Sequence, residues 1–308
     1  MKRKPHILLA LLALLIASCT KEDTTNCLEE VRVYFTFDAS AINPADVDRM
    51  HLCVFSRDGY YVGEYRDNHI PNFSTDYYIN CSGLPPGDYR FIAWGGKDER
   101  YYSTAPAPFT KGETTFDEAL IMLEHPEDVV TTLPNHIFHS ILPATVVPNQ
   151  NIQRFYMPLT QLSNTINIST VGLPSDTNAY TFNIKDNNCA YKFDRSFVSH
   201  FRGTITYTAP CVKDGAGQLH STLNVLRLAA DRRVPQLQIH NQNTDTLLYP
   251  VGEQSGDLIG LILNAYPQND FDTTHNYDIV FTFSTNFSVT ITINGWQVRD
   301  QGGEVLIN

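Results

Sequence analysis

A cysteine at the end of a short apolar run offers the clearest chemistry in this sequence, because its thiol could become the site of a covalent modification. Residues 2–4 are all basic, and residues 7–17 form a wholly apolar stretch. The small residue Ser18 directly precedes Cys19. This layout is typical of a secretory signal, and the run is too short to span a bilayer comfortably. We therefore expect residues 1–18 to be a signal peptide.

The segment Leu15-Ile16-Ala17-Ser18-Cys19 resembles the bacterial lipobox, in which the cysteine thiol is diacylated and the cysteine becomes the new N-terminus. Two or three acyl chains hold a protein firmly on a membrane, since each buried methylene contributes roughly 0.8 kcal/mol. We expect Cys19 to carry the lipid, residues 19–29 to form a tether, and the remaining chain to form a body outside the cytoplasm. An ordinary signal peptide cut elsewhere, with Cys19 incidental, is the alternative.

Other reactive side chains do not form a convincing catalytic or metal-binding set. His136 and His139 would point to opposite faces of a strand, which suits separate histidines better than a zinc site. Ser255 lies one place too late for a Gly-x-Ser-x-Gly nucleophile elbow. Carboxylates are numerous, and glycosidase chemistry needs two of them about 5–10 Å apart across a cleft, which a sequence cannot show. We expect no enzyme activity, no metal and no cofactor.

The other cysteines could form disulfides, because an exported compartment permits them. Cys53 with Cys81, and Cys189 with Cys211, are the pairs closest in sequence that could each lie within one domain. With Cys27 as a fifth thiol, at least one cysteine lacks a partner, and the sequence leaves the connectivity open.

Composition bounds the protein's partners and its size. The 308 residues carry a formal net charge of −11, which becomes −14 when the three basic residues of the signal are removed. An acidic body is a poor binder of nucleic acid, where affinity depends on Lys and Arg meeting phosphates. About 290 mature residues exceed one typical core, so two domains are the natural expectation.

Apolar residues alternate with polar residues along most of the chain, which indicates strands with one buried face. Asp58-Gly59 between two such runs predicts a hairpin, and a second hairpin is expected between residues 277–283 and 287–293. Only residues 258–265 show helical spacing. The sequence therefore predicts an all-β fold of antiparallel sandwiches, with domains at 30–148 and 149–308 divided by the Pro- and Asn-rich stretch 143–152.

Several segments, taken in order, resemble one family. The second cysteine of Cys19-Thr-Lys-Glu-Asp-Thr-Thr-Asn-Cys27 follows an acidic tether, and Leu52-Cys-Val-Phe-Ser-Arg-Asp-Gly59 comes next. The most specific segment is Leu84-Pro-Pro-Gly-Asp-Tyr-Arg-Phe-Ile-Ala-Trp-Gly-Gly96, and Ile293-Asn-Gly-Trp296 lies near the end. Over almost the whole chain, the sequence is similar to the fimbrillin-A-associated anchor lipoproteins of Bacteroidetes, the non-stalk subunits of their fimbriae.

The resemblance implies two tandem transthyretin-like Greek-key β-sandwich domains and a lipid-anchored position on the outer membrane at the cell surface. It also implies that the partner is a fimbrial stalk subunit, joined by strand donation, a form of β-augmentation. Stalk subunits of the family lose an N-terminal strand to a protease that cuts after Arg or Lys, whereas anchors stay uncut. Here Lys21, Arg32 and Arg49 are the basic residues near the first strand.

The segment that would be donated is expected at the end of the chain, at Val305, Leu306 and Ile307. The alternative for this segment is pairing within its own domain. The alternative for the whole chain is a surface carbohydrate-binding lipoprotein built from similar sandwiches, which exposed, coplanar Tyr or Trp rings on one face would favour.

Overall fold

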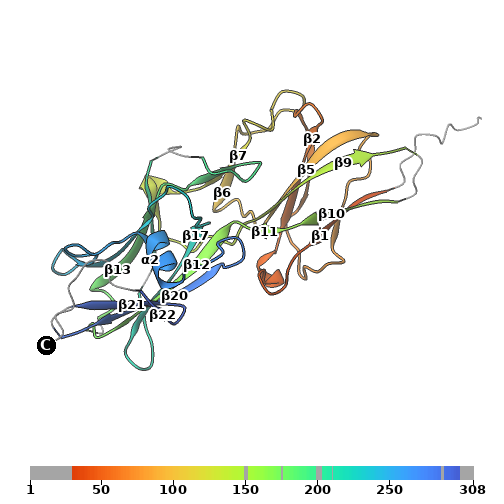
Figure 1. Ribbon diagram of the computed structural model, residues 1–308. Coiled ribbons are helices and arrows are strands. Elements are labelled where there is room, and N and C mark those ends of the chain that lie inside the picture. Colours follow the sequence, from red (N-terminus) through yellow and green to blue (C-terminus); the bar gives the residue numbers. More distant parts are fainter. Residues whose placement is uncertain are drawn as a thin grey trace, which may run out of the picture.

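The computed structural model describes residues 30–148, 152–174, 176–198, 203–209, 211–285 and 288–298. The described chain is nearly all β, as the alternating sequence predicts. Strands gather in two halves, with β1, β2, β5, β9 and β10 in one half and β12, β13, β20 and β21 in the other (Figure 1). Among these residues, no helix has the length and hydrophobicity that a membrane crossing requires.

The first half contains two sheets. The smaller sheet has the order β10-β1-β4, formed by Gln153–Pro158, Val31–Thr36 and Tyr78–Asn80. The larger sheet has the order β11-β9-β5-β2-β3, formed by Thr160–Gln161, Phe138–Val146, Gly87–Gly95, Met50–Ser56 and Tyr61–Asp67. A short 3-10 turn, η2 (Pro44–Asp46), lies between β1 and β2.

The second half also contains two sheets. One has the order β16-β17-β12-β20-β21-β22, formed by Val212–Lys213, Leu219–Leu226, Ser163–Val171, Asn276–Phe283, Val289–Ile293 and Trp296–Gln297. The other has the order β19-β18-β13-β15-β8, formed by Thr246–Tyr249, Gln236–Asn241, Tyr180–Asp186, Ile205–Ala209 and Val129–Val130. Helix α2 (Leu258–Ala265) buries four apolar residues against this half.

A fifth sheet and one short strand bind the two halves together. The sheet has the order β14-β7-β6, formed by Ala190–Lys192, Leu120–Leu123 and Tyr102–Ala105. Thus β7, which comes early in the chain and pairs with β6, also pairs with β14 from the later part. Strand β8, which follows the 3-10 turn η3 (Pro126–Asp128), likewise pairs in parallel with β15.

Local sequence signals locate the turns well. The Asp58-Gly59 hairpin joins β2 to β3, the second predicted hairpin joins β20 to β21, and the one predicted helix is α2. Pro143, however, lies inside β9 rather than in a linker. Proline fits there because β11 pairs only with the start of β9, so the backbone at Pro143 has no strand on that side and needs no donor.

The chain leaves the first half later than the predicted division between residues 148 and 149. Strand β10 pairs with β1 along six residues, and β11 pairs with β9, so both belong to sheets of the first half. From β12 onward, the strands belong to the second half or to the connecting sheet. The domain division itself stays a prediction.

Two apolar clusters fill the interior, and β2 and β5 contribute to both. Met50, Leu52 and Val54 pack in the cluster between the two sheets of the first half. Cys53 and Phe55, on the opposite face of β2, belong to the cluster that runs into the second half. The larger sheet of the first half is therefore buried on both faces, which is why β2 lacks the exposed face that alternation alone suggests.

Phe193 is the centre of the contact between the halves, which we call the aromatic joint: Phe55, Trp94, Phe109, His139 and Phe193. The Phe193 ring centroid lies 5.5 Å from those of Trp94 and Phe109, and 5.9 Å from that of Phe55. Each of these pairs has an edge-to-face geometry, which aromatic quadrupoles favour and which adds about 0.5–1.5 kcal/mol per pair beyond area burial. Aromatic rings of the first half thus surround a side chain of the second half.

His139 completes the aromatic joint with a polar contact. Its Nε2–H donates to the Phe193 carbonyl oxygen at 2.9 Å, and its ring lies 4.6 Å from that of Trp94. Burial lowers the pKa of His139 to about 4, because an imidazolium would have to leave water. His51, on the same face of the sheet, is also buried, and its pKa is also lowered to about 4, chiefly by burial.

The joint should therefore weaken in acid. The pKa of His139 is lower in the folded chain than the ordinary value near 6.5 in the unfolded chain, so the unfolded state binds the proton first. We expect the free energy of unfolding to be highest above pH 6.5 and to fall between pH 6.5 and 4, by up to about 3 kcal/mol for this residue. Urea unfolding at several pH values measures this.

The control for this prediction is a histidine on the surface. His139→Gln, which keeps an N–H donor for the Phe193 carbonyl, should reduce the pH dependence, while His51 maintains part of it. The same change at the exposed His69 should leave the pH dependence as it is. Equal slopes for the wild type and His139→Gln would contradict the assignment.

Candidate functional site

Strand β1 is the middle strand of the smaller sheet of the first half. It lies between β10 and β4, paired in parallel with the first and antiparallel with the second. Its inward side chains Val31, Val33 and Phe35 are completely buried. Burying such side chains contributes about 1.5–3 kcal/mol each, so withdrawing β1 would expose a large apolar area and leave the backbones of two strands unpaired. The chain itself thus provides the middle strand of this sheet.

The two arginines near β1 both form ion pairs with acidic side chains. Arg32 lies within the strand, and its Nη2 is 2.5 Å from Oε2 of Glu30. Arg49 ends the segment before β2, where its guanidinium pairs with Asp48 at 2.9 Å and with Asp98 at 3.2 Å. Its carbonyl oxygen accepts from Gly96 N–H at 3.0 Å. Neither bond after these arginines lies in an open loop that could enter a protease.

Tyrosines form a row across the outer face of the β10-β1-β4 sheet. The Tyr34 ring stacks on Tyr156 at 5.3 Å and is tilted against Tyr78 at 5.2 Å, while Arg32 lies 4.6 Å above Tyr78. A hydrogen bond with Arg32 lowers the pKa of Tyr34. The rings face one another instead of lying flat in one plane, so Tyr34 has neighbours on both sides. This geometry does not offer the coplanar surface that the carbohydrate-binding alternative needs.

This tyrosine row was missed by sequence reasoning, although a signal exists. Tyr34 and Tyr156 occupy outward positions of their strands, where alternation predicts polar residues. Their meeting depends on the parallel register of β1 with β10, which pairs Tyr34 with Tyr156 across more than a hundred residues of sequence. Such a long-range register cannot be read from local pattern.

The last described strands form an exposed edge at the end of the molecule remote from β1 (Figure 1). Strand β22 pairs only with β21, so its other side is open among the described residues. Trp296 on this strand is 59% exposed and stacks on the exposed Tyr266 at 6.0 Å. An exposed aromatic pair beside an open strand edge is the kind of surface that another chain can cover.

The residues predicted to carry lipid and to donate a strand lie outside the described part of the chain. These are Cys19 and the segment Val305, Leu306 and Ile307. Their roles stay predictions. The described structure bears on them only through the elements next to them, β1 at one end and β22 at the other.

The predicted disulfides are not formed in the structure. Cys53 and Cys81 are free and buried in different apolar clusters, on opposite faces of the first half's larger sheet. Cys211 is also free, so it makes no bond with Cys189. Burial raises the pKa of the Cys53 and Cys81 thiols to about 12, so both stay protonated. Sequence separation suggested these pairs, but packing places the first two on opposite sides of a sheet.

No catalytic or metal-binding arrangement emerges from the part of the chain that the structure describes. In it, no group of three or more His, Cys, Asp or Glu side chains could hold a metal ion. His136 and His139 go to different partners: His136 Nδ1 lies 2.9 Å from Ser163 Oγ, and His139 bonds to Phe193. His139 lies on β9, whereas His136 precedes that strand, so the two do not share it.

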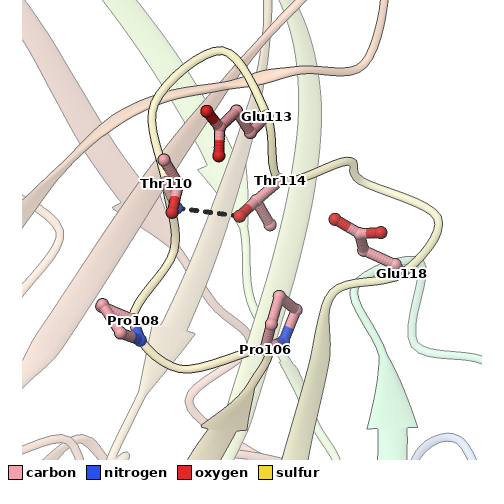
Figure 2. A pocket seen from close by; sticks show the side chains of 6 residues that line it. All are labelled: Pro106, Pro108, Thr110, Glu113, Thr114 and Glu118. Carbon is pink, nitrogen blue, oxygen red and sulfur yellow. Dashed lines mark hydrogen bonds between the residues drawn. The ribbon is translucent and has the colours of Figure 1, made fainter.

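A depression of about 380 Å³ lies over the loop that follows β6 (Figure 2). Its walls include Glu113 and Glu118, which gives it an acidic lining. Thr110 N–H donates to Thr114 Oγ1 at 2.8 Å, and the Glu118 carboxylate accepts from Thr115 N–H at 2.8 Å. These groups shape the loop, and no basic side chain joins them in the depression's lining.

Comparison with known proteins gives the family. A family model described as the fimbrillin-A-associated anchor proteins Mfa1 and Mfa2 matches residues 23–302. No curated protein matches the chain. The match covers most of the sequence, and its members are fimbrial anchor or accessory proteins at the cell surface, not enzymes.

Solved structures show the same fold. The fimbrial anchor protein Mfa2 from Porphyromonas gingivalis is 18% identical, with a TM-score of 0.69 over 88% of this chain and 99% of that one. A Bacteroides thetaiotaomicron protein provisionally described as polysaccharide-binding is 20% identical, with a TM-score of 0.74 over 88% and 98%. A provisionally described adhesin from the same species is 19% identical, with a TM-score of 0.70 over 89% and 98%. By the match to its sequence model, the chain belongs to the fimbrillin-A-associated anchor protein family.

Proposed function

We propose that this family member is the lipid-anchored terminal subunit of a fimbria. Its N-terminal lipid on Cys19 holds it in the outer membrane, and its C-terminal strand, including Val305, Leu306 and Ile307, completes a sheet of the adjoining stalk subunit. The observation that carries the proposal is the position of β1, which fills its own sheet with Val31, Val33 and Phe35 fully buried. A subunit whose groove is filled can donate a strand but cannot accept one.

The arrangement of the described ends supports this direction of assembly. β1 follows the tether and lies in the first half, while the open edge at β22 lies in the other half, away from it (Figure 1). A subunit held at one end and joined at the other can link a membrane to a fibre. The exposed Trp296 and Tyr266 beside that edge would be covered by the stalk subunit.

The groove should resist the protease that opens stalk subunits. Treating the folded protein with an Arg-specific protease should yield no fragment beginning at Val33 or Met50, because both preceding arginines are held in structure. Mass spectrometry of the products measures this. Phe35→Ala removes a buried ring, at a cost of about 3–5 kcal/mol, and should expose the bond after Arg32 to cleavage.

This variant is also the positive control, since it shows that the bond is cleavable once β1 is loosened. Release of an N-terminal strand from the wild-type protein at a rate matching Phe35→Ala would contradict the proposal that the groove stays filled.

Loss of the lipid should release the whole assembly. Cys19→Ala removes the acylated thiol, so we expect fimbriae to be shed into the medium with this subunit still attached to them. Electron microscopy of cells and immunoblotting of culture supernatants measure both. Cys53→Ala, which removes a buried thiol that bears no lipid in this proposal, is the matched control. Fibres still fixed to cells in Cys19→Ala would refute lipid anchoring through this residue.

The donated segment can be tested by its alternation. In a strand, Val305 and Ile307 share one face and Leu306 lies on the other. We expect Val305→Asp with Ile307→Asp to abolish binding to a stalk subunit, and Leu306→Asp to weaken it less, in a pull-down with purified proteins. Charge on the inward face would have to be buried without a partner.

A control distinguishes donation from pairing within the chain. Deleting residues 303–308 should leave the unfolding free energy of the isolated subunit unchanged if the segment serves only the partner. A loss of several kcal/mol, together with intact binding, would mean that the segment completes its own domain instead.

A further inference from the structure

A cavity of about 100 Å³ lies beside the aromatic joint, on the face of the larger first-half sheet that is turned away from the β10-β1-β4 sheet. Trp94, Phe109 and Phe193 form its apolar wall. The exposed Pro108 and the part-exposed Arg66 mark its open side. Pro108 belongs also to the depression in Figure 2, so one loop separates the two hollows.

Lys97 lines this cavity and is unusually placed for a lysine. It follows the Trp94-Gly95-Gly96 segment at the end of β5 and is only 5% exposed. With the described residues it makes neither a hydrogen bond nor an ion pair of its own. Burial lowers the pKa of Lys97, because the charged ammonium loses part of its contact with water. Such a group is expected to gain a partner from outside the chain.

The nearby carboxylates are already engaged by another cation. Glu64 pairs with Arg66 at 2.6 Å, and Glu99 pairs with the same guanidinium at 3.0 Å. Neither carboxylate forms an ion pair with Lys97, so the ammonium has no direct partner among the described residues. His51, whose pKa is lowered to about 4 chiefly by burial, is neutral at ordinary pH and adds no charge.

We propose that the cavity binds a small carboxylate with a short apolar body. Its carboxylate would accept hydrogen bonds from Lys97, and its carbon chain would lie against Phe109 and Phe193. One water molecule needs roughly 10–15 Å³ of cavity volume. A cavity of about 100 Å³ can therefore hold a ligand no larger than several water molecules. The apolar wall favours a monocarboxylate over inorganic phosphate, which has no apolar part to contact it.

The chain offers a built-in reporter for this site. It contains two tryptophans, and Trp296 is far more exposed than Trp94, which lines the cavity. In a Trp296→Phe background, fluorescence comes from Trp94 alone. Titration with propionate at constant ionic strength should give a saturable change at millimolar concentrations. Binding should strengthen from acetate to butyrate and disappear for octanoate, because the cavity limits chain length.

Three comparisons decide the proposal. Lys97→Met, which keeps a long apolar side chain, should weaken propionate binding at least about ten-fold, whereas Lys111→Met in the exposed loop should not change it. Propionamide, the neutral analogue, and inorganic phosphate should bind more weakly than propionate. If propionate gives no saturable signal, or the same signal in Lys97→Met, or one that propionamide matches, the site is not a carboxylate site. Circular dichroism of each variant verifies that it folds.

Discussion

Phe193 is the contact on which the rest of the architecture depends, because it is held among rings from the other half of the molecule. Its neighbours Phe55, Trp94 and Phe109 all precede the strand β10 that closes the first half. Around it, β7 pairs with both β6 and β14, and β8 extends a sheet of the second half. Apolar packing, ladder hydrogen bonds and the His139 bond to the Phe193 carbonyl thus act at one place.

This joint gives the two ends of the molecule a fixed relation, which matters for the proposed role of linking a membrane to a fibre. The first half is completed by its own strand β1, and the second half ends in the open edge at β22. A flexible link between the halves would leave these two ends independent. The paired strands and the buried rings of the aromatic joint instead hold together the sheet that β1 completes and the open edge at β22.

Much of the fold can be predicted from local pattern, because alternation and turn chemistry act over a few residues. The two hairpins and helix α2 follow from Asp58-Gly59, from the paired runs near the C-terminus and from the spacing of Leu258, Leu261 and Ile262. The burial of both faces of β2 could not be predicted, since it depends on segments far away in sequence. The same is true of Pro143 in an edge region of β9 and of the tyrosine row.

The candidate site likewise has features that the sequence can predict and features that it cannot. Sequence indicates the family, since an ordered set of motifs carries it, whereas Cys19 and residues 305–307 stay predictions. Sequence cannot show the ion pair between Arg49 and Asp98. Arg49 precedes β2 and Asp98 follows β5, so the two residues meet only when these strands pair. From sequence, cysteines can be paired only by their separation along the chain. Packing instead places Cys53 and Cys81 on opposite faces of one sheet.

The parallel pairing of β1 with β10 has a mechanical consequence. In the lipid-anchored subunit proposed above, a pull directed along β1 would enter the strand at its first residue, Val31. The hydrogen bonds to β10 and β4 then lie across the direction of the load and share it, instead of opening one after another from an end. Flow acting on a fibre would thus meet a strand loaded in shear, the geometry in which a β-ladder is hardest to break.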